Sequence, residues 1–320
     1  MPGAERPRVL AVGVFDGVHL GHQAVLARTR ELAAQVGGQV VVTTFEPSPD
    51  EFFRPDGPDR RLTLPEEKLA LLAAQGVELC VVVRFDRKLS QWPCERFVRD
   101  LYVRGLGAQA VVAGESHTFG AGGAGTIETL QGLGRQYGIG VARVPLAQVN
   151  TSPVSSTAIR QALRAGDVAR AGEMLGRPYA IEGQVERGTG TGRTLGFPTA
   201  NVAVPERKVV PADGVYVGCA YLGSQQALAA VNVGGAPTLG RPARLVEAYL
   251  IEGELRPALP SEGRKGTRLR VEFVQRLRDE AVFESTAALA EQIGRDVEQI
   301  KQMRQAAPAG QLQPLRASAC

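Results

Sequence analysis

Several residue types that often mark a function are scarce in this 320-residue sequence. It holds three histidines, five lysines, four cysteines and one tryptophan. The cysteines, Cys80, Cys94, Cys219 and Cys320, are far apart and form no CxxC pair, which argues against a structural zinc site or a disulfide framework. We therefore expect reduced thiols, with Cys80 and Cys219 in strands.

Long apolar segments are also missing. No stretch approaches the roughly 20 apolar residues of a membrane-spanning helix, and the N-terminus MPGAERPRVL lacks the apolar core of a signal peptide. We therefore expect a cytoplasmic protein with no membrane partner. The net charge of only +4, from 37 basic and 33 acidic residues, is too small to favour nucleic acid as a partner.

The overall composition is that of an ordinary globular protein, with 44% hydrophobic and 22% charged residues. At roughly 100–200 residues for each domain, the length suits two domains.

The first half of the sequence alternates two hydrophobic periodicities. Apolar runs rich in β-branched residues predict buried strands, and segments with helical spacing lie between them. Strands that alternate with helices are typical of an open parallel sheet with helices on both faces. We expect strands at 8–15, 40–45, 80–85, 108–114 and 140–147, and helices at 21–36, 65–76, 95–104, 126–136, 155–166 and 168–176.

The pattern changes after GRP at 176–178. Short strand-like runs follow, separated by turn residues, and this predicts an antiparallel barrel or sandwich. Helical spacing returns only at 286–303, which predicts one amphipathic C-terminal helix. We predict domains at 1–178 and 179–304, followed by a flexible tail at 305–320.

The densest motif of the first domain is GVFDGVHLGH, between the first predicted strand and the first predicted helix. Such a junction presents backbone N–H groups and a positive helix end, so phosphate is the expected ligand. His19 and His22 are three residues apart on one helical face and could donate to the same polyphosphate. The alternative is one solvated histidine and one cap or core partner. Glycines that would let the ligand approach the backbone are Gly13, Gly17 and Gly21.

Hydroxyl groups gather at the start of a later predicted helix, in SPVSSTAIR. Ser155, Ser156 and Thr157 at a helix N-terminus, with Arg160 one turn further, make a second candidate anion site. The same residues could also serve as plain helix caps.

The densest motif of the second domain is GTGTGRTLGFPTANV at 188–202. Its glycines could wrap phosphates with backbone N–H groups. Thr199 and Asn201 alternate along an extended segment, so both point to one side, where their oxygens could hold Mg²⁺ with nucleotide phosphates. A glycine-rich loop followed by an edge strand is the structural alternative.

GVFDGVHLGH and the SSTAIR segment resemble the HxGH class of nucleotidylyltransferases. More narrowly, they resemble the adenylyltransferase half of the bacterial bifunctional riboflavin kinase/FMN adenylyltransferase (FAD synthetase) family, as do TFEPSP, LTLPEEKLALL and GESHTFGAGGAGTIETL. The resemblance implies a Rossmann-like α/β domain in which His19 and His22 engage the ATP phosphates. It assigns the nucleotide to Gly13, Phe15, Asp16, Gly17, Gly21, Ser155, Ser156, Thr157 and Arg160, and the flavin to Glu115 and Phe119.

GRTLGFPTAN matches the riboflavin kinase signature of the same family, and PADGVYVG, AAVNVGGAPTLG, RLVEAYLI and LRVEFVQRLRDEAVF match its later segments in order. The resemblance implies an antiparallel barrel with a terminal helix. It makes Glu247 the base that takes the proton of the ribityl 5′-hydroxyl, a position that would otherwise be an exposed strand residue. It assigns Mg²⁺ to Thr199 and Asn201, the flavin to Arg278, and the nucleotide to Gly192, Arg193, Gly196, Pro198, Thr199 and Asn201.

The expected activity is therefore ATP-dependent phosphorylation of riboflavin to FMN, followed by adenylylation of FMN to FAD with release of pyrophosphate. We expect Mg²⁺ as cofactor, ATP and flavins as the small-molecule partners, and a monomer or weak homo-oligomer. The second step needs no protein nucleophile, because the FMN phosphate attacks the α-phosphorus of ATP directly.

Two alternatives stay open. A paralogue with altered flavin or nucleotide specificity, or with one active half, is motivated by departures from the family pattern at Ser48, Ser116, His117 and Ala236. A non-catalytic flavin-binding module is the other, and the intact histidines, Thr199, Asn201 and Glu247 argue against it.

Overall fold

The structure is a computed structural model that describes residues 6–55, 61–187, 191–235, 244–252, 255 and 267–306. Gly188, Gly190, Ala236 and the predicted tail beyond residue 306 lie outside this part. The chain divides into two compact units, Met1–Ser156 and Thr157–Cys320. The predicted boundary after residue 178 stays a prediction.

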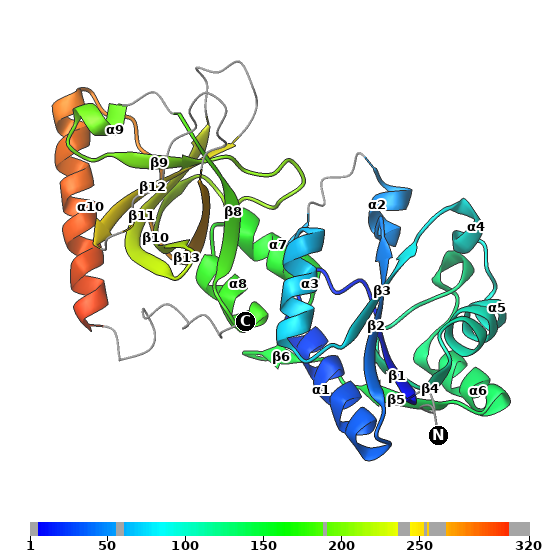
Figure 1. Cartoon of the computed structure of the whole chain (residues 1–320). Helices are drawn as coiled ribbons and strands as arrows, with labels where there is room; N and C mark the ends of the chain where they lie inside the picture. Colours follow the sequence, from blue (N-terminus) through cyan, green and yellow to red (C-terminus); the bar gives the residue numbers. More distant parts are fainter. Residues whose placement is uncertain are drawn as a thin grey trace. The chain divides into compact units, whose positions relative to one another are not determined.

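The first unit contains an all-parallel sheet of five strands in the order β3-β2-β1-β4-β5 (Figure 1). The strand order reverses at β1, so β1 and β4 leave a crevice at their carboxyl ends, where ligands bind in such sheets. The strands are β1 (Arg8–Val12), β2 (Gln39–Glu46), β3 (Leu79–Arg84), β4 (Ala108–Gly114) and β5 (Gly140–Val144).

Helices cover both faces of this sheet, as predicted (Figure 1). Val9 and Ala11 of β1 pack with Leu26 on one face, whereas Leu10 and Val12 pack with the other set of helices. Because β1 alternates its side chains, a strand of five residues supplies both cores. The helices are α1 (Leu20–Gln35) and α3 (Pro65–Ala74) on the first face, and α5 (Cys94–Arg96), η1 (Phe97–Gly105) and α6 (Ile127–Tyr137) on the second.

Some predicted bounds were wrong. The first strand ends at Val12 and not at residue 15, because residues 13–18 form a turn in which Phe15 and Val18 have positive φ angles. The last strand ends at Val144, and the short pair β6 (Gln148–Val149) and β7 (Ser152–Pro153) follows it. The predicted helix 95–104 is the short α5 followed by the π-helical η1. Short helices absent from the prediction are α2 (Pro49–Phe53), α4 (Arg87–Ser90), η2 (Ala121–Gly123) and α9 (Thr191–Thr194).

The second half forms a closed barrel with strand order β10-β11-β12-β9-β8-β13. The pattern of short strands was compatible with either a barrel or a sandwich. The antiparallel pairing of β13 with β10 closes the sheet, so the fold is a barrel. Its strands are β8 (Tyr179–Glu186), β9 (Thr199–Val202), β10 (Gly214–Leu222), β11 (Gln225–Gly235), β12 (Arg244–Glu252) and β13 (Arg268–Arg278), preceded by α7 (Ser156–Arg164) and α8 (Val168–Leu175).

The predicted terminal helix is α10 (Thr286–Ala306), which extends three residues beyond the expected end. Its Ile300 is fully buried against Val217, Leu228 and Ala230 of the barrel. Cys80 lies in β3 and Cys219 in β10, as predicted, and both are free thiols. None of the helices in the described ranges is long and apolar enough to cross a membrane.

Candidate active sites

The turn that follows β1 carries the histidine motif in a strained backbone. Phe15 has a φ of 55° and Val18 a φ of 41°, values that non-glycine residues seldom adopt. The amide of Gly13 donates to the carbonyl of Thr43 (3.2 Å), and that of Val18 to the carbonyl of Phe15 (3.2 Å). Such strain persists only where the surroundings hold it, and it gathers at functional sites.

His19 is the N-cap of α1, and its ring folds back over the helix start. Its Nδ1 accepts from the amide of His22 at 3.4 Å, so the neutral ring carries its proton on Nε2. A Cβ on Gly21 would lie 3.1 Å from the His19 ring, which explains the glycine between the histidines. The motif therefore places a ring N–H donor beside the free amides of a helix N-terminus.

The two imidazole rings are stacked, with centroids 3.7 Å apart and planes at 17°, and Phe15 lies 5.0 Å from His22. Burial lowers the pKa of His22 well below its usual value, and electrostatic repulsion from His19 and Lys68 lowers it further. His22 is therefore neutral at pH 7. Its buried Nδ1 has no hydrogen-bond partner within the described part of the chain, so a ring nitrogen remains for a ligand.

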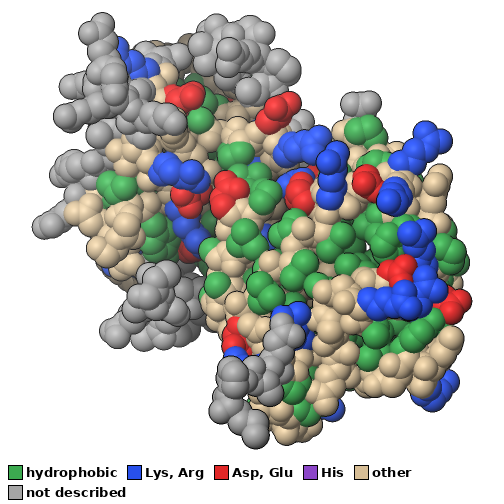
Figure 2. Space-filling view, turned by 45° about the vertical axis from the view of Figure 1, so that its right-hand side comes forward, with side chains coloured by type: hydrophobic (Ala, Val, Ile, Leu, Met, Phe, Trp, Pro, Cys, Tyr) green, Lys and Arg blue, Asp and Glu red, His purple; other side chains and the backbone are tan. Residues whose placement is uncertain are grey.

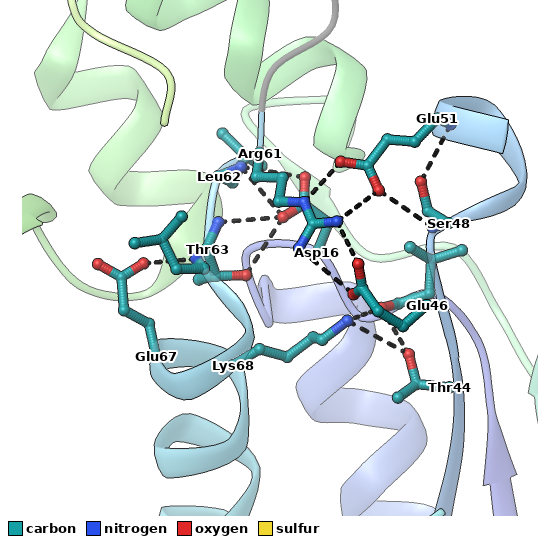
Figure 3. Close-up of polar contacts among 12 residues, drawn as sticks. Asp16, Thr44, Glu46, Ser48, Glu51, Arg61, Leu62, Thr63, Glu67 and Lys68 are labelled. Carbon is teal, nitrogen blue, oxygen red and sulfur yellow. Dashed lines mark hydrogen bonds and ion pairs between the residues drawn. The ribbon is translucent and has the colours of Figure 1, made fainter. Parts of the chain in front are cut away.

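Asp16 anchors a neighbouring segment instead of pointing into open space. Its carboxylate accepts the amides of Leu62 (3.0 Å) and Thr63 (3.0 Å) and the Thr63 hydroxyl (3.2 Å), and that hydroxyl accepts the amide of Gly17 (3.0 Å). Figure 3 shows the contacts of Leu62 and Thr63 converging on the carboxylate. The assignment of Asp16 and Gly17 to the nucleotide stays a prediction.

The serine-rich helix start reaches the same turn. The hydroxyl of Ser156 donates to the carbonyl of Asp16 at 2.9 Å, which ties the last residue of the first unit to the histidine turn. Ser155 and Thr157 are exposed, and Arg160, one turn further along α7, is buried. Their contacts with ATP stay predictions.

Beyond the carboxyl ends of β2, β3 and β4 lies a cleft of about 700 Å³. One wall is aromatic: the rings of Phe52 and Phe53 meet edge to face at 5.2 Å, and each packs on Phe85. Phe53 is 62% exposed. Figure 2 shows, for one face of the molecule, that apolar side chains reach the surface among charged ones. Lining residues are Phe52, Phe53, Arg87, Ser90, Gln91, Ala121 and Gly122.

The sequence reasoning missed this cleft, although it noted the TFEPSP motif just before it. Ser48 of that motif caps α2: its hydroxyl accepts the amide of Glu51 (3.3 Å), and its amide donates to the Glu51 carboxylate (3.0 Å). This S-x-x-E capping box is a readable helix-start signal, so α2 was predictable from the sequence.

The two residues assigned to the flavin in the first unit lie in different surroundings. The Glu115 carboxylate binds the Arg143 guanidinium and accepts the amide of Leu146, and the Arg143 hydrogen bond lowers its pKa. Phe119 is 6% exposed and belongs to the core. Both assignments stay predictions.

His117, one of the departures from the family pattern, stacks parallel to Phe119 at 5.9 Å. Burial lowers its pKa to about 4, so the ring is neutral at pH 7. Its Nε2 is buried without a hydrogen-bond partner in the residues that the structure describes. The neighbouring Ser116 is exposed.

In the barrel, strand register places two predicted site residues, Glu247 and Asn201, beside a third residue, Asn232, that the sequence did not single out. Glu247 of β12 pairs with Asn201 of β9 on one side and Asn232 of β11 on the other. Burial raises the pKa of Glu247, the hydrogen bond with Asn232 opposes this, and the nearby Glu280 raises it further. A carboxylate with a raised pKa is a stronger proton acceptor. Asn232 and Glu280 were not singled out from the sequence.

Thr199 and Asn201 are two residues apart in β9 and so lie on the same side of the strand, as predicted. Asn201 is 6% exposed, and its Oδ1 is buried with no hydrogen-bond partner among the described residues. An unsatisfied amide oxygen beside a hydroxyl suits a hard cation such as Mg²⁺.

The glycines before β9 are needed for a tight turn. The amides of Leu195 and Phe197 donate to the Gly192 carbonyl (3.2 and 2.8 Å). A Cβ on Gly192 would lie 2.5 Å from the Phe197 carbonyl oxygen, and Gly196 has a φ of 84°. Pro198 is exposed, and the side chain of Arg193 lies outside the described part. The nucleotide assignments of these residues stay predictions.

Arg278, assigned to the flavin by resemblance, is held by another group in the structure. Its guanidinium donates three hydrogen bonds of 2.7 to 3.0 Å to Asp296 of α10. Arg278 thus ties β13 to α10, and its flavin contact stays a prediction.

Comparisons with known proteins agree with both halves of this description. Residues 2–158 match the family model for FAD synthetase, and residues 175–304 match the model for riboflavin kinase. The bifunctional riboflavin kinase/FMN adenylyltransferase of Escherichia coli strain K12 is 38% identical over 90% of each chain. The Bacillus subtilis protein of the same description is 34% identical over 90% of each.

A solved structure also matches over nearly the whole chain. The crystal structure of a Streptococcus pneumoniae protein described as a macrolide-efflux protein has a TM-score of 0.83 and 30% identity, covering 93% of this chain and 95% of its own. This likeness extends to both halves of the fold.

Proposed function

The chain belongs to the bifunctional riboflavin kinase/FMN adenylyltransferase family, and we propose how its residues perform the two reactions. The barrel transfers the γ-phosphoryl group of ATP to riboflavin, giving FMN and ADP. The first unit transfers AMP from ATP to FMN, giving FAD and pyrophosphate. The observation that carries this proposal is that the two predicted sites are built independently, one around Glu247 and one around the histidines.

In the kinase reaction, Glu247 accepts the proton of the ribityl 5′-hydroxyl. The hydroxyl oxygen then bonds to the γ-phosphorus, and the bond from that phosphorus to the β–γ bridging oxygen breaks. The buried position and the raised pKa of Glu247 suit it to this role. Mg²⁺, when bound through Thr199 and Asn201, neutralises phosphate charge.

In the adenylyl transfer, a phosphate oxygen of FMN attacks the α-phosphorus of ATP, and the bond to the leaving pyrophosphate breaks. The Nε2 proton of His19 and the amides at the start of α1 donate to phosphate oxygens. Neutral His22 supplies a second ring nitrogen in the same stack. Because these donors are fixed before ATP binds, they stabilise the developing charge without reorganising.

We assign the flavin ring system of FMN to the cleft beside α2. Phe52 and Phe53 present an apolar wall to a flat aromatic ligand, and Arg87, Ser90 and Gln91 supply polar groups at its edge. The cleft follows the carboxyl ends of β2 and β3, on the same sheet edge as the histidine turn.

The test is to incubate the pure protein with riboflavin, ATP and Mg²⁺ and to separate the flavins by chromatography. We expect FMN to appear first and FAD to follow. FMN without FAD would mean one active half, and tight riboflavin binding without either product would mean a binding module. Replacing ATP by other nucleoside triphosphates tests nucleotide choice.

A change in flavin specificity is a second candidate, favoured by one observation. The Nε2 atom of His117, one of the departures from the family pattern, is buried without a partner in the described ranges. A flavin analogue with an added polar group that is adenylylated faster than FMN would support it. The cytoplasmic location and the monomeric or weakly oligomeric state stay predictions.

A further inference from the structure

The aromatic wall of the cleft is carried by a helix too short to be stable alone. Helix α2 has five residues, and isolated helices of fewer than about 12 residues are marginal in water. Its position therefore depends on contacts made by its ends. The capping box of Ser48 and Glu51 closes the first turn, but it does not tie α2 to the sheet.

Arg61 makes that connection. Its Nε and Nη2 donate to the two Glu51 oxygens at 2.5 and 2.8 Å, and Nη1 donates to Glu46 Oε2 at 3.3 Å, with a further Nη2 contact to Glu46 Oε1. Glu46 is the last residue of β2, so one guanidinium holds the end of the strand and the helix together. The Arg61 and Glu51 side chains are only 14% and 15% exposed, so water screens these pairs weakly.

The same segment is bound to the histidine turn. Leu62 and Thr63, which follow Arg61, are held by the Asp16 carboxylate through both backbone amides and the Thr63 hydroxyl. Figure 3 shows the Asp16 carboxylate against Leu62 and Thr63, and the Arg61 side chain reaching from the same segment to Glu51 and Glu46. Residues 61–63 therefore form a continuous bridge from the phosphate-binding turn to α2.

We propose that Arg61 is a positioning residue for the flavin substrate, which fixes the Phe52–Phe53 wall of the cleft at a set distance from the histidine turn. This inference rests on the proposed adenylyl transfer to FMN at the cleft. Arg61 itself touches neither reacting phosphate in this scheme. Arg61 instead acts on the affinity for FMN, because it sets whether the flavin ring and the flavin phosphate can be bound at the same time.

The experiment measures steady-state constants for FAD formation from FMN and ATP. For Arg61→Gln we expect the KM for FMN to rise about tenfold or more, the KM for ATP to stay within about twofold, and riboflavin phosphorylation to be unchanged. Arg61→Lys should give a KM for FMN almost as high as that of Arg61→Gln, because an ammonium cannot hold two carboxylates in bidentate geometry. Glu51→Gln, which keeps the helix and removes one charge, should raise the same KM by a smaller factor.

Arg54→Gln is the matched control. Arg54 follows α2 directly, and within the described residues its ion pair is with Asp50 at the surface, where its side chain is 69% exposed, so its loss should leave both KM values unchanged. Unfolding followed by Trp92 fluorescence, the single tryptophan, shows whether each variant is folded. If Arg61→Gln does not fold, Glu51→Gln carries the test.

Two results would overturn the inference. One is an unchanged KM for FMN in folded Arg61→Gln, and the other is an equal rise in both KM values, which would indicate general damage to the site. Absence of FAD formation in the wild-type protein would instead refute the proposed function, so the two failures are distinct.

Discussion

Asn201 and Glu247 lie directly opposite each other on the adjacent antiparallel strands β9 and β12. The register therefore puts a buried amide oxygen, which has no hydrogen-bond partner among the residues that the structure describes, next to a carboxylate with a raised pKa. Under the proposed kinase reaction, Asn201 would hold a hard cation and Glu247 would accept the proton, the two roles that phosphoryl transfer to a hydroxyl requires.

Glu247→Gln should lower the kinase rate by about 10² to 10⁴, because glutamine keeps the shape and cannot accept the proton. FAD formation from added FMN should be unchanged. The two rates are measured separately, on riboflavin and on FMN. A kinase rate within about twofold of the wild type would remove Glu247 as the base.

As the pH falls, the kinase reaction should begin to lose activity at a higher pH than it would if its base were an exposed glutamate. Because burial raises the pKa of Glu247, the base becomes protonated while the pH is still above the usual glutamate range. The acidic limb of the kcat/KM profile for riboflavin should therefore lie above about pH 4.3, the ordinary glutamate value. A limb at or below that value would contradict the assignment.

His19→Ala should lower FAD formation by about 10² to 10³, because it removes a fixed donor and the cap of α1 together. His19→Asn is the informative companion, since asparagine caps helices well. If the loss comes from the donor, asparagine restores stability and not activity. Riboflavin phosphorylation by the same preparation is the internal control.

Asp16→Ala should destabilise the first unit by about 2–4 kcal/mol, because two buried amides and a hydroxyl lose a charged acceptor. Asp50→Ala, at an exposed position of α2, should cost less than about 1 kcal/mol. Urea unfolding monitored by Trp92 fluorescence gives both values. Equal losses in the two variants would show that Asp16 anchors nothing.

His117 should make the first unit sensitive to acid. Its pKa is lowered to about 4 by burial, so the unfolded chain binds the proton first as the pH falls below about 6.5. The free energy of unfolding should therefore drop by on the order of 2–3 kcal/mol between pH 7 and pH 4 through this residue alone. His117→Phe should lack that part of the pH dependence in Trp92-monitored unfolding. Parallel pH profiles for the two proteins would refute the assignment.

Periodicity predicted the layers of this fold well because buried faces impose it. Successive apolar residues of β1 pack into the cores on the two faces of the sheet. The apolar residues of α10 are spaced so that they lie on the side of the helix that contacts the barrel. Periodicity alone did not distinguish a barrel from a sandwich, because the pairing of β10 with β13 joins segments separated by two other strands; the barrel that the family resemblance implied is confirmed.

The strand–turn–helix junction that carries the histidines was predictable for a similar reason, because it is local in sequence; its binding of phosphate stays a prediction. The Arg61 bridge was not predictable, because its partners Glu46 and Glu51 lie 15 and 10 residues away with no periodic relation. Asp16 shows the same limit. It was assigned to a ligand, and its carboxylate is bound to a segment 46 residues further along the chain.

Barrel topology sets an order in which the two halves can be completed during synthesis. All five strands of the parallel sheet lie before residue 145, so the ribosome finishes that sheet early. The barrel closes through β13, which pairs with both β8 and β10. The ring of barrel strands therefore cannot close until β13, which ends at residue 278, has emerged from the ribosome. The nascent chain can thus hold a folded adenylyltransferase sheet while the kinase is still an open set of strands.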